Sequence, residues 1–168
     1  MHPDAEKWIE LLELSPHPEG GYFSETYRSD LTLPKASLGE GFPGDRASST
    51  AIYYLLNEDN FSALHRIASD EMWHFYAGSA LRVEGLHPDG RREDWILHND
   101  PTVGRPQEIV PAQTWFGSRL MKPEGYALVG CTVSPGFDFA DFEMAPRTEM
   151  VKSFPEHQSW IESLTRNA

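Results

Sequence analysis

The chain has 168 residues, with 26 acidic and 14 basic side chains and a formal net charge of −12. This length predicts one well-packed domain and is too short for two. A surface with this excess of negative charge repels phosphate backbones and anionic lipids, which argues against nucleic acids and membranes as partners. The 13 glycines, 13 prolines and 12% aromatic residues favour a turn-rich β architecture over a helical bundle.

Cysteine usage and the N-terminus both favour the cytoplasm. The single cysteine, Cys131, cannot form an internal disulfide, which fits a reducing compartment. Its apolar surroundings in the sequence predict a buried and inert thiol. Residues 1–6 lack the basic start and apolar stretch of a secretory signal, and no apolar run approaches the roughly 20 residues of a membrane span. We therefore expect a cytoplasmic protein with one domain over residues 1–168.

The first element in chain order is an amphipathic helix, predicted over residues 5–14. Asp4 is placed to cap its start and Pro16 to stop it. Its apolar side chains recur at helical spacing: Trp8, Leu11 and Leu12. Residues 15–23 then combine rigid prolines with permissive glycines, as in a loop whose backbone closely approaches another group. Residues 30–47 mix glycine, proline and charge, and are predicted to form a surface loop.

Short runs of alternating apolar and polar residues dominate from Ser48 onward, separated by turn sequences. Strands at this spacing favour a sandwich or barrel over alternating β and α units. The predicted strands are 51–56, 62–67, 72–76, 80–86, 93–98, 107–110, 115–120 and 127–133. A last short helix is predicted within 155–164. The barrel is thus expected over about 20–145 and a C-terminal tail over 146–168.

The strand around His65 and the acid that follows it form the first candidate site. On a strand, Ala63, His65 and Ile67 share one face, and Glu71 comes just after the next turn. A buried Glu71 would keep His65 charged or orient it as a general base. The alternative is a hydrogen-bonded core histidine with Glu71 decorating a turn.

Glu19, before Gly20, Gly21 and Tyr22, forms the second candidate. A loop stiffened in this way loses little entropy when it presents Glu19 and the glycine amides to a ligand. The alternative is an ordinary solvated loop acid.

Aromatic residues and late carboxylates allow two interpretations as well. Trp73 and Trp115 are candidates for pocket walls, although large aromatics more often fill a core. The acids Asp138, Asp141 and Glu143 alternate with phenylalanines, which predicts a terminal strand with its apolar side inward and its acids outward.

The stretch from His65 to Gly78 resembles the first sequence motif of the cupins. That motif runs His-x-His, three or four residues, Glu, six residues, Gly. His65, Glu71 and Gly78 take the first His, the Glu and the Gly positions, whereas Ile67 stands at the second His. The second cupin motif, Pro-x-Gly-x-x-His, begins here at Pro111.

The second motif departs from the cupin pattern in two places. Gln113 replaces its glycine and Phe116 replaces the third metal-binding histidine. A cupin metal site normally uses three His and one Glu. Only His65 and Glu71 remain here, and His74 would alternate away from Glu71 on a regular strand. We therefore expect no metal cofactor, with a divalent metal at His65 and Glu71 as the alternative.

More specifically, the chain resembles the cupin-5 (DUF985) family of small cupins over nearly its whole length. The matching stretches are 17–23, 62–78, 110–115 and 128–139. This resemblance implies an all-β fold, the double-stranded β-helix of the cupin jelly-roll barrel, and often a homodimer. It brings no established reaction.

Metal-free cupins such as the deoxysugar epimerases use a His base held by a carboxylate, with a Tyr acid opposite. By this resemblance His65 is the base, Glu71 or another acid orients it, and Tyr53 or Tyr126 is the acid. The expected ligand contacts are Glu19, Gly21, Tyr22, Trp73, His74 and Trp115. We thus expect a metal-independent cupin that binds a small polar metabolite, sugar-like or carboxylated, and acts as an epimerase or isomerase. The alternatives are a metal-dependent oxygenase or isomerase, with His74 as a third ligand, and a non-catalytic binding or sensor module.

Overall fold

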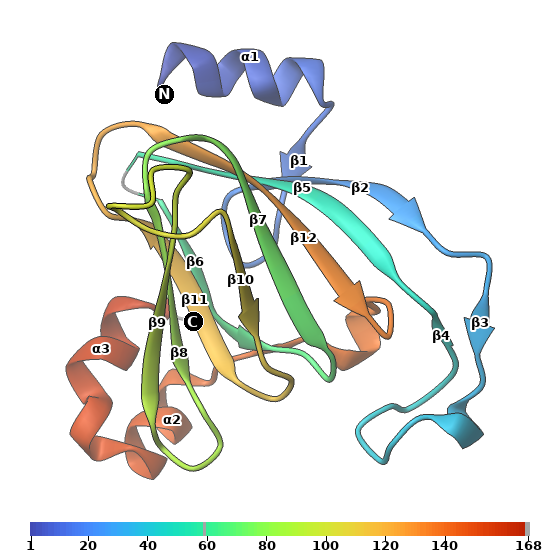
Figure 1. Ribbon diagram of the computed structural model, residues 1–168. Coiled ribbons are helices and arrows are strands. Elements are labelled where there is room, and N and C mark those ends of the chain that lie inside the picture. Colours follow the sequence, from blue (N-terminus) through green and yellow to red (C-terminus); the bar gives the residue numbers. More distant parts are fainter. Residues whose placement is uncertain (59, 167–168) are drawn as a thin grey trace.

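Two antiparallel β-sheets lie against each other and form the body of the molecule (Figure 1). The computed structural model describes residues 1–58 and 60–166. The six-stranded sheet has the order β1 (Ser15–Pro16), β2 (Tyr22–Arg28), β5 (Thr50–Asn57), β12 (Tyr126–Ser134), β7 (Asp70–Gly78) and β10 (Gln107–Val110). The five-stranded sheet has the order β13 (Glu143–Met144), β6 (Phe61–Arg66), β11 (Trp115–Leu120), β8 (Leu81–Leu86) and β9 (Arg92–Leu97). Within the described residues, hydrogen bonds do not join the two sheets into a closed barrel.

Alternation along β7 decides which side chains reach the space between the sheets. Glu71, Trp73 and Phe75 are buried on the inner face, whereas His74 and Tyr76 lie on the outer one. The same alternation in the other strands builds the main core, because apolar side chains on the inner faces are removed from contact with water. Its largest members come from both sheets: Tyr54, Trp73, Phe75, Trp95 and Phe116.

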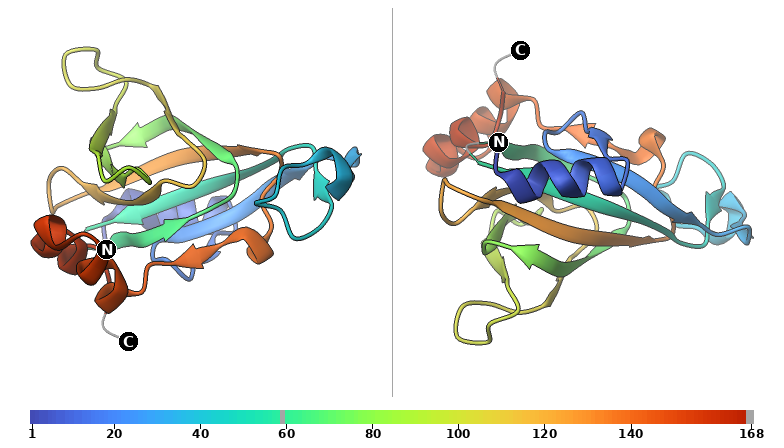
Figure 2. Two further views of the ribbon diagram at one scale, coloured as in Figure 1. Left: turned by 90° about the horizontal axis from the view of Figure 1, so that it is seen from below. Right: turned by 90° about the horizontal axis from the view of Figure 1, so that it is seen from above.

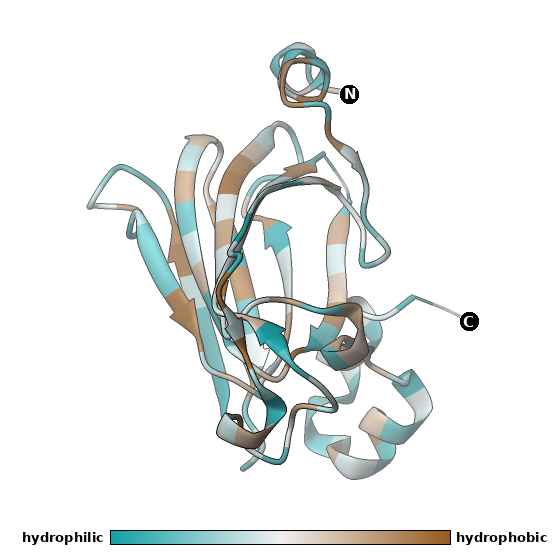
Figure 3. Ribbon diagram, turned by 90° about the vertical axis from the view of Figure 1, so that its right-hand side faces the viewer, coloured by the Kyte–Doolittle hydropathy of each residue, from teal (hydrophilic) through white to brown (hydrophobic). Residues whose placement is uncertain are grey.

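The N-terminal helix α1 (Pro3–Leu11) covers part of the outer face of the six-stranded sheet (Figure 1). Figure 3 shows the helix end-on beside the strands. Its residues Trp8 and Ile9 pack with Leu55 and Leu128 of the sheet. The predicted boundaries need correction, because the helix begins at Pro3 and its N-cap is His2, whose Nδ1 accepts the N–H of Asp4. No helix in the described part of the chain is both long and apolar enough to cross a membrane.

The C-terminal tail holds more structure than the single predicted helix. It forms α2 (Arg147–Ser153), the short 3₁₀ turn η3 (Pro155–His157) and α3 (Gln158–Ser163). These helices pack at one side of the five-stranded sheet (Figures 1 and 2). Their residues Met150 and Ile161 form a second core with Leu64, Leu86 and Trp115.

Strand β2 is absent from the sequence prediction, and the predicted loop 30–47 contains some regular structure. A register shift between Glu25 and Tyr27 interrupts the alternation of β2, and most of its residues are exposed, so its pattern is weak. The 30–47 segment includes β3 (Thr32–Leu33), the turn η1 (Lys35–Ser37) and β4 (Arg46–Ala47). In Figure 1 this ribbon extends beyond the two sheets.

Candidate functional site

A cavity of about 240 Å³ opens between the sheets, roughly eight times the volume of one water molecule in the liquid. Its polar lining residues are His17, Glu19, Glu25, Arg28, Thr50, Tyr54, His65, Glu71, Cys131 and Asp138. Its apolar lining residues are Phe23, Ile52, Ile67, Trp73, Val133, Phe137, Phe139 and Phe142. An apolar wall with a few converging polar groups is the usual composition of a small-molecule site.

Glu19 reaches the cavity from the loop between β1 and β2. Gly20 and Gly21, which follow it, have φ values of 117° and 71°, in the left-handed region. A Cβ on Gly20 would lie 2.3 Å from the carbonyl oxygen of Phe61, and one on Gly21 would lie 2.7 Å from that of Leu55. The two glycines therefore let the loop pack close to β5 and β6, and this fixes the position of Glu19.

Glu19 and His65 form a buried polar pair in the cavity wall. Oε2 of Glu19 lies 3.0 Å from Nε2 of His65, and Oε1 accepts a hydrogen bond of 2.9 Å from the Ser62 hydroxyl. The other ring nitrogen of His65, Nδ1, lies 2.8 Å from the carbonyl oxygen of Ala63. A carbonyl oxygen can only accept, so Nδ1 carries a proton.

One further proton lies between Glu19 and His65, because two bare lone pairs would repel at 3.0 Å. Burial raises the pKa of Glu19 and lowers the pKa of His65. Both shifts favour the neutral form of each group. The pair shares one proton between the carboxyl oxygen and Nε2 and carries no net charge at either position of that proton.

Glu71 presents a second carboxyl group to the cavity from β7. Burial raises its pKa to about 7, with His65 opposing the shift and Glu19 adding to it. The thiol of Cys131, on the neighbouring strand β12, forms a hydrogen bond with Glu71, and burial raises the pKa of this thiol well above its usual range. Near neutral pH Glu71 is present in both protonation states, which suits a group that both gives and takes protons.

His17 and Trp73 complete the polar wall. Nδ1 of His17 accepts a hydrogen bond of 3.3 Å from the backbone N–H of Glu19, and burial lowers the pKa of this histidine, so the ring is neutral. Trp73 is 1% exposed, and its indole N–H has no hydrogen-bond partner among the described residues. Buried donors without a partner are uncommon. This nitrogen has less than 1 Å² of accessible surface, so it does not open into the cavity.

In the more exposed part of the lining, the positive charge of Arg28 is paired with the carboxylate of Glu25. Arg28 donates two hydrogen bonds to Glu25, of 3.0 and 2.7 Å, and a third of 3.1 Å to the carbonyl oxygen of Phe137. The guanidinium is therefore largely neutralised by its own neighbour on β2.

The chain after β12 folds across the cavity and supplies three phenylalanines. Phe137, Phe139 and Phe142 pack edge to face, with ring centroids 5.0 to 6.1 Å apart. The predicted strand over this segment is wrong in part: residues 139–141 form a 3₁₀ turn, η2 (Phe139–Asp141), followed by the short β13. Asp141 is also buried, because it pairs with Arg46 at 2.5 Å instead of facing solvent.

Four of the predicted site residues line the cavity: His65, Glu71, Glu19 and Trp73. The prediction that Tyr53 or Tyr126 faces His65 is wrong. Both tyrosines pack with α1 on the outer face of the six-stranded sheet, where Tyr126 Oη accepts a hydrogen bond from the indole of Trp8. Alternation on β5 turns Tyr54, the neighbour of Tyr53, inward instead.

The other expected ligand contacts also lie outside the cavity lining. Trp115 belongs to the second core, under the guanidinium of Arg66. His74 lies on the outer face, where its ring bonds Thr132 and Gln107. Of the predicted loop residues, Gly21 and Tyr22 are likewise not part of the lining.

Several cavity residues were not predicted, including Tyr54, His17 and Arg28. Tyr54 donates a hydrogen bond of 2.8 Å to the carbonyl oxygen of Gly20 and so ties β5 to the loop that carries Glu19. Its inward direction could have been predicted, because Ile52 and Tyr54 share one face of the predicted strand 51–56.

The residues present do not fit the usual three-histidine metal set. Ile67 and Phe116 occupy the positions of two imidazoles, and Phe116 packs against the ring of His65 with centroids 4.2 Å apart. Both ring nitrogens of His65 already have partners, Ala63 and Glu19. Among residues 1–58 and 60–166, no group of three or more His, Cys, Asp or Glu side chains is arranged to hold a metal ion.

The jelly-roll architecture and a polar cavity between its sheets define the class of protein. Oxalate decarboxylase of Bacillus subtilis superposes with a TM-score of 0.53 at 14% identity, covering 89% of this chain and 36% of that one, a likeness in fold alone. The chain therefore has the double-stranded β-helix fold of the cupins, as predicted. Its sequence matches the family described as Cupin superfamily (DUF985) over residues 6–145, and the chain belongs to that family.

Three relatives extend this likeness. A protein of Shewanella oneidensis superposes with a TM-score of 0.87 at 35% identity, covering 98% of both chains. A hypothetical protein of Leishmania major gives 0.88 at 32% identity, covering 97% of this chain and 99% of that one. An uncharacterised protein of Saccharomyces cerevisiae is 31% identical over 138 residues, covering 77% of this chain and 69% of its own.

Proposed function

We propose that this protein is a metal-independent cupin that binds a small polar metabolite in its cavity and moves a proton on it. The observation that carries the proposal is the pairing of Glu19 and His65 at 3.0 Å beside the buried carboxyl of Glu71. Two buried carboxyl groups whose pKa values are raised by burial, inside an apolar wall, suit general acid–base chemistry.

The geometry supports a change in the roles expected from the sequence. Glu19, not Glu71, is the carboxyl group that contacts His65. Both nitrogens of His65 are engaged, so His65 acts by holding the proton of Glu19. Glu71, whose hydrogen bond is to Cys131, is then the general base or acid that touches the substrate.

The reaction class follows from these roles. Glu71 as carboxylate takes a proton from a carbon next to a carbonyl group, and the Glu19–His65 pair gives its shared proton to the carbonyl oxygen. For an isomerisation, Glu71 then gives its proton to the neighbouring carbon, and the Glu19–His65 pair takes the hydroxyl proton from the carbon that was first deprotonated. For an epimerisation, the enol turns over in the cavity, Glu71 gives its proton to the other face of the same carbon, and the pair recovers its proton from the enol oxygen.

Deuterium exchange tests this proposal without knowledge of the product. Neutral sugars and hydroxyketones, amino sugars, and hydroxy acids as their carboxylates are incubated with the protein in heavy water, and loss of the carbon-bound proton is followed by NMR. We expect exchange on at least one compound, slowed by about 100-fold or more in Glu71→Gln. Glu149→Gln, which removes the same charge from an exposed position on α2, serves as the control.

One alternative is a binding module without catalysis, supported by the engagement of both nitrogens of His65. Under this alternative a compound from the same panel raises the melting temperature but exchanges no proton. An unchanged exchange rate in Glu71→Gln would instead remove Glu71 from the reaction.

Metal independence has its own test. Elemental analysis of untagged protein, purified without chelator, is expected to find no stoichiometric Fe, Mn, Ni or Zn. A stoichiometric metal would favour the oxygenase or isomerase alternative. The cytoplasmic location and the homodimer stay predictions from the sequence and the family.

A further inference from the structure

We infer that the inner part of the cavity binds an organic cation, so that the ligand carries an amino group and not a carboxylate. This inference rests on the proposed function, because it names the chemistry of the metabolite that the same cavity takes.

Charge along the cavity lining favours a cation. The lining holds four carboxyl groups, Glu19, Glu25, Glu71 and Asp138, against one guanidinium, Arg28. Glu25 neutralises Arg28 through two hydrogen bonds. A carboxylate ligand would therefore meet acids with little positive charge left to receive it.

Within this set, Glu71 is the carboxyl group left for a cationic partner. Glu19 shares a proton with His65, so that pair carries no net charge wherever the proton lies. Asp138 accepts the backbone N–H of Ala140 and lies near the guanidinium of Arg28. Among the described residues, Glu71 makes no ion pair with a lysine or an arginine. An ammonium group beside it would form a charge-assisted hydrogen bond in a water-poor site.

Aromatic side chains in the wall favour the same ligand. Phe23, Phe137, Phe139 and Phe142 line the cavity together with Trp73. The face of an aromatic ring carries partial negative charge and attracts an organic cation, whereas it repels a carboxylate.

Three probes of one shape and different charge test the inference. Benzylamine, benzyl alcohol and benzoate are titrated into the intact protein by calorimetry at about pH 8, where the amine and the carboxylate are charged and Glu71 is mainly ionised. We expect benzylamine to bind at least about tenfold more tightly than the other two probes. Glu71→Gln should bring benzylamine close to benzyl alcohol, while Glu149→Gln should leave the ranking unchanged.

Benzoate binding as tightly as benzylamine would overturn the inference, and so would a lack of binding by all three probes. The ranking in the unmodified protein stands on its own if Glu71→Gln fails to fold. If the protein catalyses deuterium exchange on an uncharged compound but benzylamine does not bind most tightly of the three probes, the proposed function stands and only the inference of an amine ligand is lost.

Discussion

At the scale of single residues, the pKa of Glu71 is set mainly by its burial, because no lysine or arginine among the described residues forms an ion pair with it. Desolvation by burial is the largest effect on the pKa of this carboxyl group, and the opposing effects of His65, which lowers the pKa, and Glu19, which raises it, partly cancel. The folded protein therefore holds the Glu71 proton more tightly than the unfolded chain does. This couples its titration to the stability of the fold.

The first prediction concerns the pH dependence of stability. The pKa of Glu71 rises from 4.5 to about 7 on folding, so stability is full below 4.5 and falls as pH rises toward 7. This loss amounts to about 3 kcal/mol. Glu71→Gln has no such titration, so the free energy of unfolding of the wild type, relative to this variant, should fall by that amount between about pH 5 and about pH 8. Urea unfolding at several pH values measures the difference, and a difference that stays constant with pH would contradict the account.

Only part of the candidate site could be predicted from the sequence. Spacing placed His65 and Glu71 on neighbouring strands, and both line the cavity. The contact between Glu19 and His65 joins a loop to a strand distant in sequence, and local spacing carries no information about it. Tyr53, the expected acid, lies on the outer face of β5. Side chains alternate along the strand, so its neighbour Tyr54 takes the position that lines the cavity.

At the scale of elements, strands bounded by clear turn residues are predicted most accurately. Predicted strand 115–120 matches β11, because turn residues bound it on both sides. Strand β2 and turn η2 were not predicted. A bulge breaks the alternation of β2, and the acids near η2 read as exposed although Asp141 is paired with Arg46.

The pair between Arg46 and Asp141 leads to the second prediction. It joins β4 to the η2 turn, and both side chains are at most 5% exposed. Asp141→Ala leaves a buried guanidinium uncompensated and should cost about 3 kcal/mol of unfolding free energy. The variant should also speed hydrogen exchange of residues 137–144, which fold across the cavity.

The matched control for this pair is the double variant Arg46→Met with Asp141→Leu, which removes both charges and keeps similar volume. It should recover most of the lost stability, because no charge is left buried alone. A double variant as unstable as Asp141→Ala would show that the pair does not act in this way.

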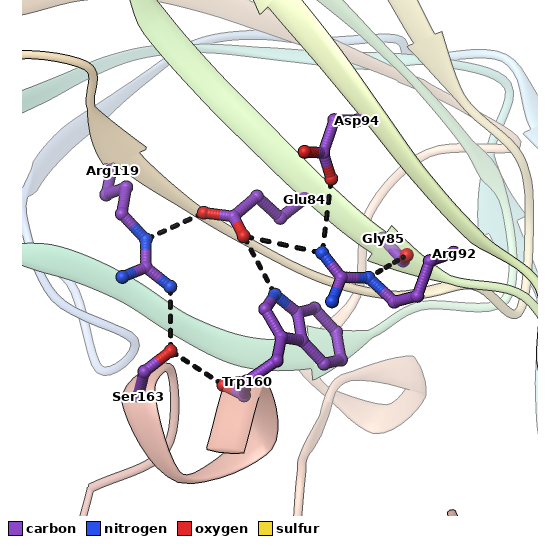
Figure 4. Close-up of polar contacts among 7 residues, drawn as sticks. All are labelled: Glu84, Gly85, Arg92, Asp94, Arg119, Trp160 and Ser163. Atoms are coloured by element: carbon purple, nitrogen blue, oxygen red, sulfur yellow. Dashed lines mark hydrogen bonds and ion pairs between the residues drawn. The ribbon is translucent and has the colours of Figure 1, made fainter. Parts of the chain in front are cut away.

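At the scale of the whole molecule, one buried acid, Glu84, links the C-terminal tail to the five-stranded sheet in addition to the apolar core between them. Figure 4 shows Glu84 between Arg92, Arg119 and the indole of Trp160. Trp160 donates a hydrogen bond of 2.8 Å to it, and Arg92 lies 3.6 Å above the tryptophan ring. Arg119 also bonds Ser163 at the end of α3, so the network joins β8, β9 and β11 to the tail.

The third prediction separates this network from the cavity. Trp160→Phe keeps a ring under Arg92 but loses the hydrogen bond to a charged acceptor, so it should cost about 2 kcal/mol of unfolding free energy. Trp8→Phe makes the same change where the acceptor is the neutral hydroxyl of Tyr126, and should cost under about 1 kcal/mol. Neither variant should alter deuterium exchange, since neither residue lines the cavity. Equal losses in the two variants would refute a special role for Glu84.

A carboxyl proton held in this cavity at neutral pH is observed most directly at the side-chain carboxyl carbon of Glu71. Carbon NMR of protein labelled at the glutamate carboxyl carbon follows the titration, and the resonance missing in Glu71→Gln gives the assignment. We expect the chemical shift of the Glu71 carboxyl carbon to titrate with a midpoint at about pH 7. A midpoint at or below the ordinary value of 4.5 would contradict it.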